Sequence, residues 1–385
     1  MMKSKLIRIT TVPISLKILL KDQLKYMSQY FEVVAISSEG KELDEVKKDE
    51  GIRTIELNMS REITPMRDLV SLVKMIFIFL KEKPDIVHTH TPKAGIIGMI
   101  ASWITRVPHR LHTIAGLPVM EATGKKKSIL LAVERLTYAC ATKVYPNSYG
   151  LRDYVLQNKL TYTEKLKIIG HGSSNGIDTK YFQRTKEILG QAKQIEKKYQ
   201  LENKFVFCFV GRVVKDKGIN ELMDVFDRLC QKYNNITLLV VGQLENSLDP
   251  ISSISEKILK NNNNIHYVGF QNDIRPYLAT STCFVLPTYR EGFPNVVLQA
   301  CSMELPCIVT DINGCNEIIE DNKNGLLVEP KNKDALYYAM NKIIENKELP
   351  TQLSLNNRND IINKYDRTIF HQYLLEEYNK VLKND

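Results

Sequence analysis

Two short segments of the sequence place charged residues directly after an apolar run. KFVFCFVGRVVKDKG carries Arg212 and Lys217, and CFVLPTYREGFPNVVLQACSM carries Glu291. Gly211 permits a sharp exit from a strand. Two cations close to the start of a helix, where the first amide N–H groups are free, suit a diphosphate. Two solvated surface cations are the alternative interpretation of this pattern.

The second segment turns from a strand into a helix directly after Glu291. Pro294 falls at or near the first helical position, where a missing N–H costs nothing. Glu291 is interpreted as an acceptor for sugar hydroxyls, with a simple helix cap as the alternative. Gln299, about two turns into the helix, offers a neutral amide that binds a diol, with a hydrogen bond to buried backbone as the alternative. The turn and the amides expected to face an anion comprise Gly292, Phe293, Asn295 and Val296.

Strand-like apolar runs alternate with helical patterns on both sides of residue 200. The first series includes KLIRITTV, FEVVAIS and DIVHTHT, and the second begins at KFVFCFVGR. This alternation predicts parallel sheets with helices on both faces. Ligands of open parallel sheets bind outside the carboxyl ends of the strands. We therefore expect an α/β protein with two Rossmann-like, doubly wound domains facing a cleft lined by the loops that follow the strands.

The change between the two series sets the expected domain boundaries. Residues 1–178 form the first domain, 179–203 a charged linker with a helix, and 204–365 the second domain. Residues 366–385 have apolar positions at helical spacing and are expected to form a helix that crosses back to the first domain. A length of 385 residues is consistent with two cores.

The bulk composition is that of a globular protein, with 43% hydrophobic and 25% charged residues. No apolar run reaches the roughly eighteen residues that span a bilayer, and the N-terminal apolar segment is interrupted by Arg8 and Lys17, which favours a strand over a signal peptide. The seven cysteines never form CxxC, which favours reduced thiols in a cytosolic compartment.

The excess of positive over negative charge belongs to the first half of the chain. Residues 1–180 contain 28 Lys and Arg against 18 Asp and Glu, although the whole chain carries a net charge of +9. A solvated basic surface is one interpretation, and an anionic partner such as a phospholipid surface is the other. The run Lys125–Lys127 beside an apolar helix, and the Lys-edged stretch LVSLVKMIFIFLKEK, suit peripheral binding to an anionic bilayer; core helices are the alternative.

Several function classes lack their signatures here. The sequence has neither GxGxxG nor GxxxxGK[ST], which argues against a dehydrogenase or a P-loop NTPase. His88 and His90 share one strand face, but no third ligand joins them and no DxD-type pair is present, so we expect no metal and no cofactor. No recognisable reading module accompanies the basic half, which disfavours nucleic acid as a partner.

The motifs of the second half occur in a specific order. VGR…DKG, HYVGF, PTYREGFPNVVLQA, LPCIVTDINGCNEII and NGLLVEP span roughly residues 205–345. Together they resemble the nucleotide-binding half of the family 4 retaining glycosyltransferases, which have the GT-B fold. The first half, with DIVHTHTPKAGIIG and NGID, is similar in layout to the subgroup that extends lipid-linked sugars in bacterial surface-polysaccharide assembly.

The resemblance implies roles position by position. Arg212 and Lys217 would hold the donor diphosphate, and Glu291 falls on the first acid of the family's E-x7-E motif, which contacts the donor sugar. Gln299 replaces the second acid and would contact the ribose. The loop Gly269–Phe270 would pack against the base. Residues expected to carry catalysis are thus Arg212, Lys217 and Glu291.

The acceptor side of the first domain departs from the family pattern. The family's HTxHG reads His112-Thr-Ile-Ala115-Gly116 here, so Ala115 stands where the second histidine is usual. Thr10-Thr11-Val12-Pro13 replaces the usual glycine pair, and Pro294 stands where glycine is frequent. The acceptor-side residues that the resemblance implies are Thr11, His112, Gly116, Asn175 and Asp178.

The expected function is that of a retaining glycosyltransferase. It would move a sugar from a nucleotide-sugar, with UDP as the expected nucleotide, to a polyprenyl-diphosphate-linked saccharide in capsular or O-antigen synthesis. It would work in the cytoplasm, peripherally on the inner face of the plasma membrane. A nucleotide-sugar 2-epimerase on the same scaffold and a basic nucleic-acid-binding protein are the alternatives.

Overall fold

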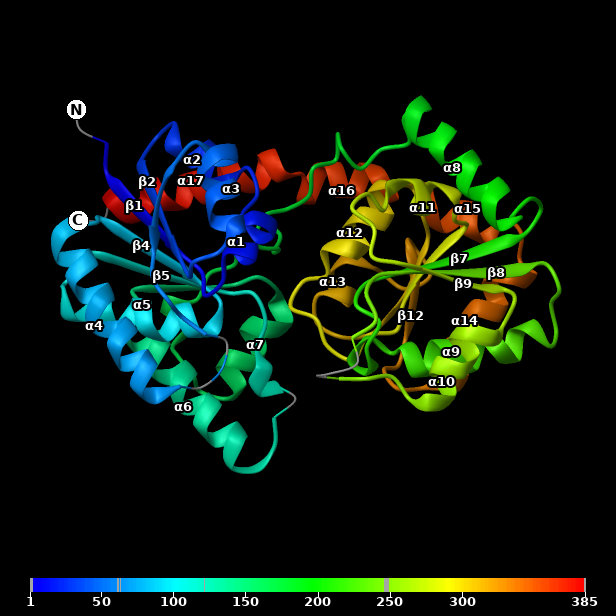
Figure 1. Ribbon diagram of the computed structural model, residues 1–385, viewed down its shortest axis with the longest axis horizontal. Helices are drawn as coiled ribbons and strands as arrows, with labels where there is room; N and C mark the ends of the chain where they lie inside the picture. Colours follow the sequence, from blue (N-terminus) through cyan, green and yellow to red (C-terminus); the bar gives the residue numbers. More distant parts are fainter. Residues whose placement is uncertain (1–2, 61, 63, 121, 246–248, 384–385) are drawn as a thin grey trace. The chain divides into compact units, whose positions relative to one another are not determined.

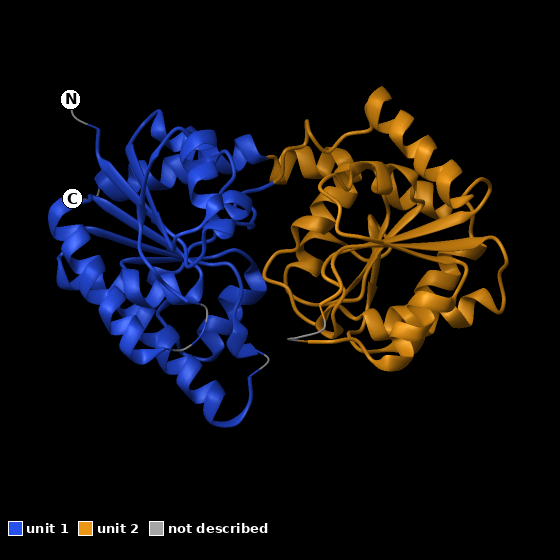
Figure 2. Cartoon of the chain, in the orientation of Figure 1, with its two compact units in different colours: residues 1–176, 367–385 blue, residues 177–366 orange. Residues whose placement is uncertain are grey.

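The computed structural model describes residues 3–60, 62, 64–120, 122–245 and 249–383. The chain forms two compact units, residues 1–176 with 367–385, and residues 177–366 (Figure 2). Each unit holds one six-stranded, all-parallel sheet with helices on both faces (Figure 1), as the alternating pattern predicts. Among the described residues, no helix combines the length and the apolar character that crossing a bilayer requires.

The sheet of unit 1 has the strand order β3-β2-β1-β4-β5-β6. Successive β1 residues face opposite sides, so Leu6 packs in one core cluster and Ile7 in the other. The strands are β1 (Lys5–Ile9), β2 (Glu32–Ser37), β3 (Arg53–Glu56), β4 (Ile86–His90), β5 (His109–Ile114) and β6 (Lys143–Pro146). The helices are α1 (Pro13–Leu19), α2 (Gln23–Ser28), α3 (Lys41–Glu50), α4 (Pro65–Glu82), α5 (Pro92–Ile104), α6 (Gly124–Cys140), α7 (Tyr149–Gln157) and α17 (Arg367–Lys383), with short turns η1 (Pro118–Met120) and η2 (Thr163–Lys165).

The sheet of unit 2 has the equivalent order β12-β11-β10-β7-β8-β9. Its strands are β7 (Phe205–Val210), β8 (Ile236–Val241), β9 (Ile265–Gly269), β10 (Cys283–Leu286), β11 (Cys307–Thr310) and β12 (Gly325–Val328). Its helices are α8 (Lys186–Tyr199), α9 (Ile219–Cys230), α10 (Ser253–Asn261), α11 (Arg275–Thr280), α12 (Asn295–Ser302), α13 (Cys315–Ile318), α14 (Lys333–Glu345), α15 (Leu349–Ser354) and α16 (Asn357–Tyr365), with the short turn η3 (Lys215–Lys217).

The segment 179–203, expected as a linker, belongs to unit 2. Its helix α8 packs against α11, and Ile188 and Ala192 are buried in the core of that unit. The charged residues on the rest of α8 made the segment resemble a linker, although its apolar stripe packs in the core. The C-terminal helix α17 belongs to unit 1 (Figure 1). Its residues Phe370, Leu374 and Tyr378 pack in the core cluster that contains Leu6 of β1.

Candidate active site

The loops after β7 and β10 meet at the point where the strand order of unit 2 reverses. β10 pairs directly with β7, while β8 and β9 follow β7 on its other side. Doubly wound sheets bind ligands outside the carboxyl ends of the strands at such a reversal. The two segments singled out in the sequence are therefore neighbours in the fold.

Lys217 and Glu291 come together at this point. Lys217 Nζ lies 2.5 Å from Glu291 Oε1, and their side chains are 17% and 16% exposed. The two loops are also joined through the backbone, because Tyr289 N donates to the carbonyl of Asp216 at 2.8 Å. Arg290 adds an ion pair with Asp216 at 3.1 Å. The pairing thus fixes a half-buried cation and a half-buried carboxylate side by side.

Gly218 allows the two loops to approach this closely. Its φ of +70° lies in the left-handed region, which glycine adopts without the cost a side chain imposes. A Cβ on this residue would lie 1.9 Å from the carbonyl oxygen of Pro287 in the loop after β10. Gly218 also precedes α9, so the same residue ends the loop and begins the helix.

Arg212 lies on the loop after β7 but does not join the Lys217–Glu291 pair. Its side chain is half exposed and pairs with Glu245 at 3.0 Å. A guanidinium has five N–H donors, so this pair leaves Arg212 able to bind a further anion. Sequence reasoning missed Glu245, which follows β8, because no motif marked that strand end.

Asn313 follows β11, which pairs with β10 on the edge opposite to β7, and it contacts the loop that carries Glu291. Its Nδ2 donates to the carbonyl of Glu291 at 2.5 Å. Gly314, with φ of +78°, places its Cα where an added Cβ would meet the Gly292 carbonyl at 2.6 Å. The quoted motif PCIVTDINGCNEII contained this support, but sequence reasoning assigned it no role.

The start of α12 agrees with the expectation that Pro294 lies at or near the first helical position. Pro294 is the N-cap residue, one position before the helix, and Asn295 and Val296 are its first two residues. Phe293 was expected at the donor site, but its side chain is buried and its ring packs 5.5 Å from that of Tyr365. Its ring is therefore part of the core of unit 2. The side chain of Gln299 is half-buried and makes no hydrogen bond within the described part of the chain.

The loop after β9 presents an exposed aromatic ring. Gly269 ends the strand with φ of +71°, and its carbonyl accepts from Gly242 N at 2.9 Å. Phe270 is 69% exposed. An exposed ring at the carboxyl end of a strand offers an apolar face to a planar ligand.

The expected acceptor-side residues of unit 1 are mostly engaged in structural contacts. Thr11 is buried; its Oγ1 lies 2.7 Å from Thr91 Oγ1 and accepts from Ala94 N at 3.2 Å at the start of α5. His112 is buried against α5, bonded to Thr89 Oγ1 at 2.8 Å, and burial lowers its pKa to about 3. The position of His112 on β5 directs its ring into the core, and its acceptor-side role stays a prediction.

The NGID turn likewise has structural partners. Asn175 is buried; its Oδ1 accepts from Gln23 Nε2 at 2.8 Å and lies 2.9 Å from His371 Nε2. Asp178 Oδ1 accepts from the backbone of Tyr181 at 2.9 Å. Gly116 lies in the half-buried loop after β5. Of the expected acceptor-side residues, Gly116 alone makes no hydrogen bond within the described part of the chain.

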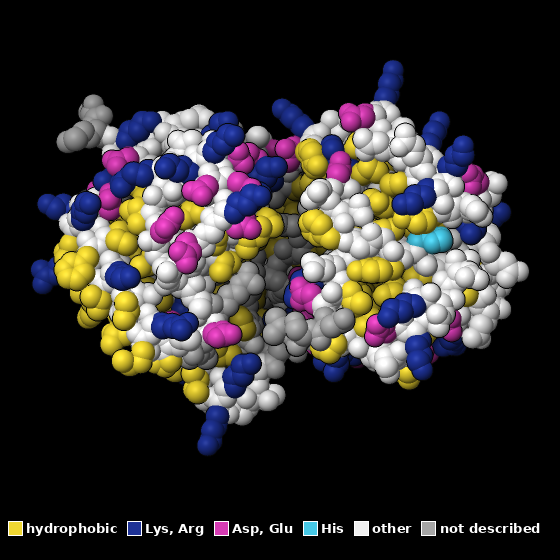
Figure 3. Space-filling model, viewed as in Figure 1, with side chains coloured by type: hydrophobic (Ala, Val, Ile, Leu, Met, Phe, Trp, Pro, Cys, Tyr) yellow, Lys and Arg dark blue, Asp and Glu magenta, His cyan; other side chains and the backbone are white. Residues whose placement is uncertain are grey.

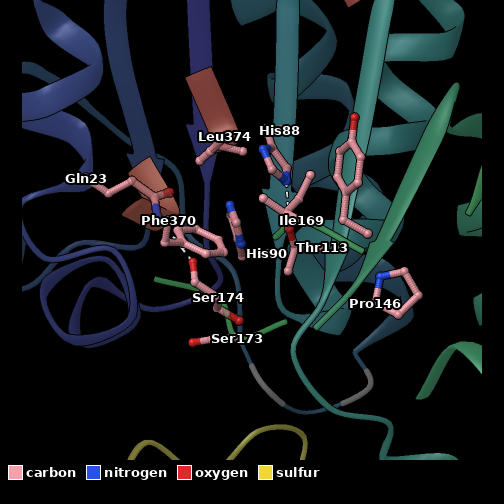
Figure 4. Close-up of a pocket in the computed structure, with 11 residues that line it drawn as sticks. Gln23, His88, His90, Thr113, Pro146, Ile169, Ser173, Ser174, Phe370 and Leu374 are labelled. Carbon is pink, nitrogen blue, oxygen red and sulfur yellow. Dashed lines mark hydrogen bonds between the residues drawn. The ribbon is translucent and has the colours of Figure 1, made fainter. Parts of the chain in front are cut away.

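A buried polar cluster lies beneath the carboxyl end of the unit 1 sheet (Figure 4). Arg8 is fully buried and contacts Gln23 Oε1 at 2.5 Å and His90 Nε2 at 2.7 Å. Because a guanidinium only donates, His90 Nε2 accepts and its proton resides on Nδ1. Burial lowers the pKa of His88 and His90 well below the ordinary value, so both rings are neutral. Within the described residues, no group of three or more His, Cys, Asp or Glu is arranged to hold a metal ion.

Comparison with known proteins agrees with this architecture. Residues 191–360 match the family model of glycosyl transferases group 1, and residues 14–148 match that of glycosyl transferase 4-like proteins. The capsular polysaccharide biosynthesis glycosyltransferase CapM of Staphylococcus aureus is 35% identical over 100% of this chain and 99% of its own length.

A further relative and a solved structure with a similar fold complete the comparison. An Escherichia coli UDP-Gal:alpha-D-GlcNAc-diphosphoundecaprenol alpha-1,3-galactosyltransferase is 29% identical over 88% of this chain and 86% of its own. Anabaena HepE, crystallised with UDP and glucose, superposes with a TM-score of 0.81 at 18% identity, covering 98% of this chain and 100% of its own, which establishes the fold alone. The chain belongs to the family 4 glycosyltransferases and has the GT-B fold. It is therefore a glycosyltransferase.

Proposed function

We propose that this glycosyltransferase moves a sugar from a UDP-sugar to a polyprenyl-diphosphate-linked saccharide, with retention of configuration, in capsular or O-antigen polysaccharide synthesis. The observation that carries the proposal is the Lys217–Glu291 pair at the strand reversal of unit 2. The names of two relatives support the same class: CapM is named for capsular polysaccharide and the Escherichia coli relative for a diphosphoundecaprenol acceptor.

Lys217 has the capacity to bind a diphosphate while it keeps its carboxylate partner. An ammonium group has three N–H donors, of which Glu291 takes one. The remaining donors, with Arg212 and the free amides at the start of α12, would stabilise the charge that builds on the departing nucleotide. The second carboxylate oxygen of Glu291 would accept from a hydroxyl of the donor sugar. Leaving-group stabilisation then needs no metal ion.

The half-buried Gln299 and the exposed Phe270 complete the proposed donor site. Gln299 lies on α12, whose N-terminus would face the phosphates, and its side-chain amide has hydrogen-bonding capacity for the ribose diol. Phe270, after β9, would pack on the base. Both roles are those that the family resemblance assigns to these positions.

The membrane-facing part of the proposal rests on α4 and its surroundings in unit 1. Figure 3 shows hydrophobic side chains gathered over the region where Figure 1 draws α4, with Lys and Arg around them. Isolated exposed apolar residues are ordinary, but a contiguous group indicates an interaction surface. The exposed apolar residues of α4, here called the α4 face, are Met66, Leu69, Val70, Val73, Phe77 and Leu80. Peripheral attachment through the α4 face and Lys125–Lys127 would bring unit 1 to a lipid-linked acceptor.

Product analysis tests the proposal. The full chain is incubated with a panel of UDP- and GDP-sugars and polyprenyl-diphosphate-linked saccharides, and the anomeric configuration of each product is read by NMR. We expect transfer from one UDP-sugar with the donor's configuration kept. Inversion, or a requirement for a GDP-sugar, contradicts the corresponding part of the proposal, and donor turnover to an epimer without acceptor favours the 2-epimerase alternative.

Vesicle sedimentation tests the membrane part. At low salt we expect the chain to sediment with phosphatidylglycerol vesicles and to release when Lys125–Lys127 are changed to Ala, since each basic residue contributes roughly 1 kcal/mol near an anionic surface. The matched control changes three exposed lysines of unit 2, Lys323, Lys342 and Lys347, to Ala. No sedimentation by the wild type, or equal release by both variants, contradicts attachment through this surface.

A further inference from the structure

An apolar groove follows α5 in unit 1. Its volume is about 970 Å³, at the upper end of the roughly 300–1,000 Å³ typical of ligand sites. α5 packs against both α4 and α6, so these two helices supply the walls and α5 the floor between them. The lining side chains of the three helices include Leu69, Leu72, Ile96, Ile100, Ile129 and Val133.

One end of the groove reaches the carboxyl edge of the unit 1 sheet. Thr11 follows β1 and Thr91 follows β4, and both line the groove. β1 and β4 are the pair at which the strand order of this sheet reverses, which is the ligand-binding edge of a doubly wound domain. The groove therefore joins a reaction-side edge to an apolar channel that runs away from it.

Charged side chains line the groove beside its apolar residues. Lys93 forms an ion pair with Asp68, and Lys126 lies at the wall formed by α6, next to Lys125 and Lys127. Two further acids line the groove. Glu62 is exposed, and Glu134 is buried, which raises its pKa to about 7. Near neutral pH Asp68 is thus paired, Glu134 is partly protonated and Glu62 is exposed to water. The cation Lys126, with its neighbours Lys125 and Lys127, suits an anionic head.

The groove is continuous with the α4 face, because Leu69 belongs to both. A chain that leaves a bilayer beside the α4 face would enter the groove without crossing a polar surface. A soluble sugar would gain nothing from this path because it has no apolar chain to bury. An amphiphile with an anionic head and a long apolar tail therefore fits this groove better than a soluble sugar.

We propose that this groove binds the isoprenoid chain nearest to the diphosphate of the lipid-linked acceptor, and that it holds the acceptor head at the Thr11 and Thr91 edge. The proposal rests on the proposed function, which supplies the polyprenyl diphosphate as the acceptor class. It assigns a lipid-chain site to α4, α5 and α6, and so gives these helices a role in acceptor selection beyond attachment to a bilayer.

Binding of small probes to the full chain tests the groove without any sugar transfer. Farnesyl diphosphate, inorganic pyrophosphate and dodecyl phosphate are titrated calorimetrically, below the critical micelle concentration. We expect farnesyl diphosphate to bind at least about tenfold more tightly than pyrophosphate, which is roughly 1.4 kcal/mol, and more tightly than dodecyl phosphate. Equal binding of farnesyl diphosphate and pyrophosphate overturns the proposal; equal binding of dodecyl phosphate overturns its isoprenoid assignment.

Two groove variants and one matched control locate the binding. Ile100→Glu places a charge on the floor, and Leu72→Trp fills the channel with an apolar ring. Phe77→Glu places the same charge on the exposed side of α4, outside the groove lining. We expect both groove variants to lose the preference for farnesyl diphosphate and Phe77→Glu to keep it, with thermal melts to establish that each is folded. Retention of the preference in a folded Leu72→Trp overturns the proposal.

Failure of the groove and failure of the proposed function give different results. Transfer to a lipid-linked acceptor with no binding preference for farnesyl diphosphate would contradict the groove proposal and leave the proposed function standing. A groove that binds farnesyl diphosphate in a protein that transfers sugar only to soluble acceptors would remove the lipid-linked acceptor instead.

Discussion

At the scale of single residues, the pairing of Lys217 with Glu291 determines how the proposed donor site is charged. The carboxylate holds the ammonium in place, yet it also puts negative charge beside the site proposed for two phosphates. A half-buried pair of this kind binds an anion only by sharing the cation's donors. Nucleotide binding and sugar transfer should therefore respond differently to loss of the carboxylate.

Glu291→Gln is expected to separate nucleotide binding from sugar transfer. The amide keeps the size of the side chain but removes the charge, so UDP should bind as tightly as to the wild type or more tightly. Sugar transfer should fall at least about 100-fold, or roughly 3 kcal/mol in the activation barrier. UDP titration and initial rates measure the two effects. Glu320→Gln, at an exposed acid paired with Lys323, is the control, and parallel losses of affinity and rate would contradict the assignment.

Gln299→Ala tests the ribose contact. Loss of one or two hydrogen bonds to the diol should weaken UDP by about five- to tenfold, since a typical hydrogen bond contributes about 1 kcal/mol. The transfer rate at saturating donor should stay near the wild-type value. Wild-type affinity in the variant would refute the assignment of Gln299 to the nucleotide.

Glu134 gives unit 1 a pH-dependent stability. Burial raises its pKa from the ordinary 4.5 to about 7. The folded state therefore keeps a proton that the unfolded state loses, and stability falls as pH rises from 4.5 through 7. Across that window wild type should lose roughly 3 kcal/mol relative to Glu134→Gln. Urea unfolding of both proteins at pH 5 and pH 8 measures this, and an equal pH dependence would show that Glu134 is not buried as described.

At the scale of elements, the contact between the loops after β7 and β10 depends on glycine. Gly218→Ala would place a methyl group within 1.9 Å of the Pro287 carbonyl, so one loop must move. We expect a loss of about 2 kcal/mol or more in stability and a marked loss of UDP affinity. Gly190→Ala, in the exposed middle of α8 with no atom near its Cβ, is the control and should stabilise by about 0.5–1 kcal/mol. Equal effects would contradict the role of Gly218.

Much of the fold is predictable from sequence at this scale. Apolar runs bounded by glycine and charge predict the strands, and the charged residues after two of them predict functional loops after β7 and β10. Other features were not predictable. The apolar run KLKIIGHG has the composition of a strand but makes only an isolated bridge between Leu166 and Val144 in the described chain, because strand pairing depends on neighbours that are distant in sequence.

The acceptor side shows the same limit at single positions. His112 and Asn175 matched family positions, but their roles follow from the direction of each side chain. His112 faces α5, and Asn175 bonds to Gln23 and His371, which arrives from the far end of the chain. No local pattern reports such contacts. The partners of Arg212 and Glu291, namely Glu245 and Asn313, were missed for the same reason.

At the scale of the whole molecule, the chain returns to unit 1 through α17. Tyr378 of this helix is fully buried, and its hydroxyl lies 2.6 Å from His88 Nδ1. The proposed nucleotide contacts, by contrast, all lie in unit 2. Stability of unit 1 and affinity for UDP should therefore be separable by a change in α17.

Tyr378→Ala should destabilise unit 1 by about 3–5 kcal/mol, as other large-to-small aromatic substitutions in cores do. UDP affinity should stay within about twofold of the wild type. Thermal melts with and without UDP, together with a UDP titration at low temperature, measure both. A large loss of UDP affinity in the folded variant would show that unit 1 supplies part of the nucleotide site.

The central claim is that unit 2 binds the donor diphosphate through Lys217 and Arg212 without a metal ion. Calorimetric titration of UDP into the full chain in EDTA tests it most directly, with Lys217→Ala and Arg212→Ala beside the exposed control Lys323→Ala. The account predicts binding by the wild type and control, and a loss of at least about tenfold in each site variant, or roughly 1.4 kcal/mol. Binding that needs a divalent cation, or site variants that bind UDP as the wild type does, would contradict it.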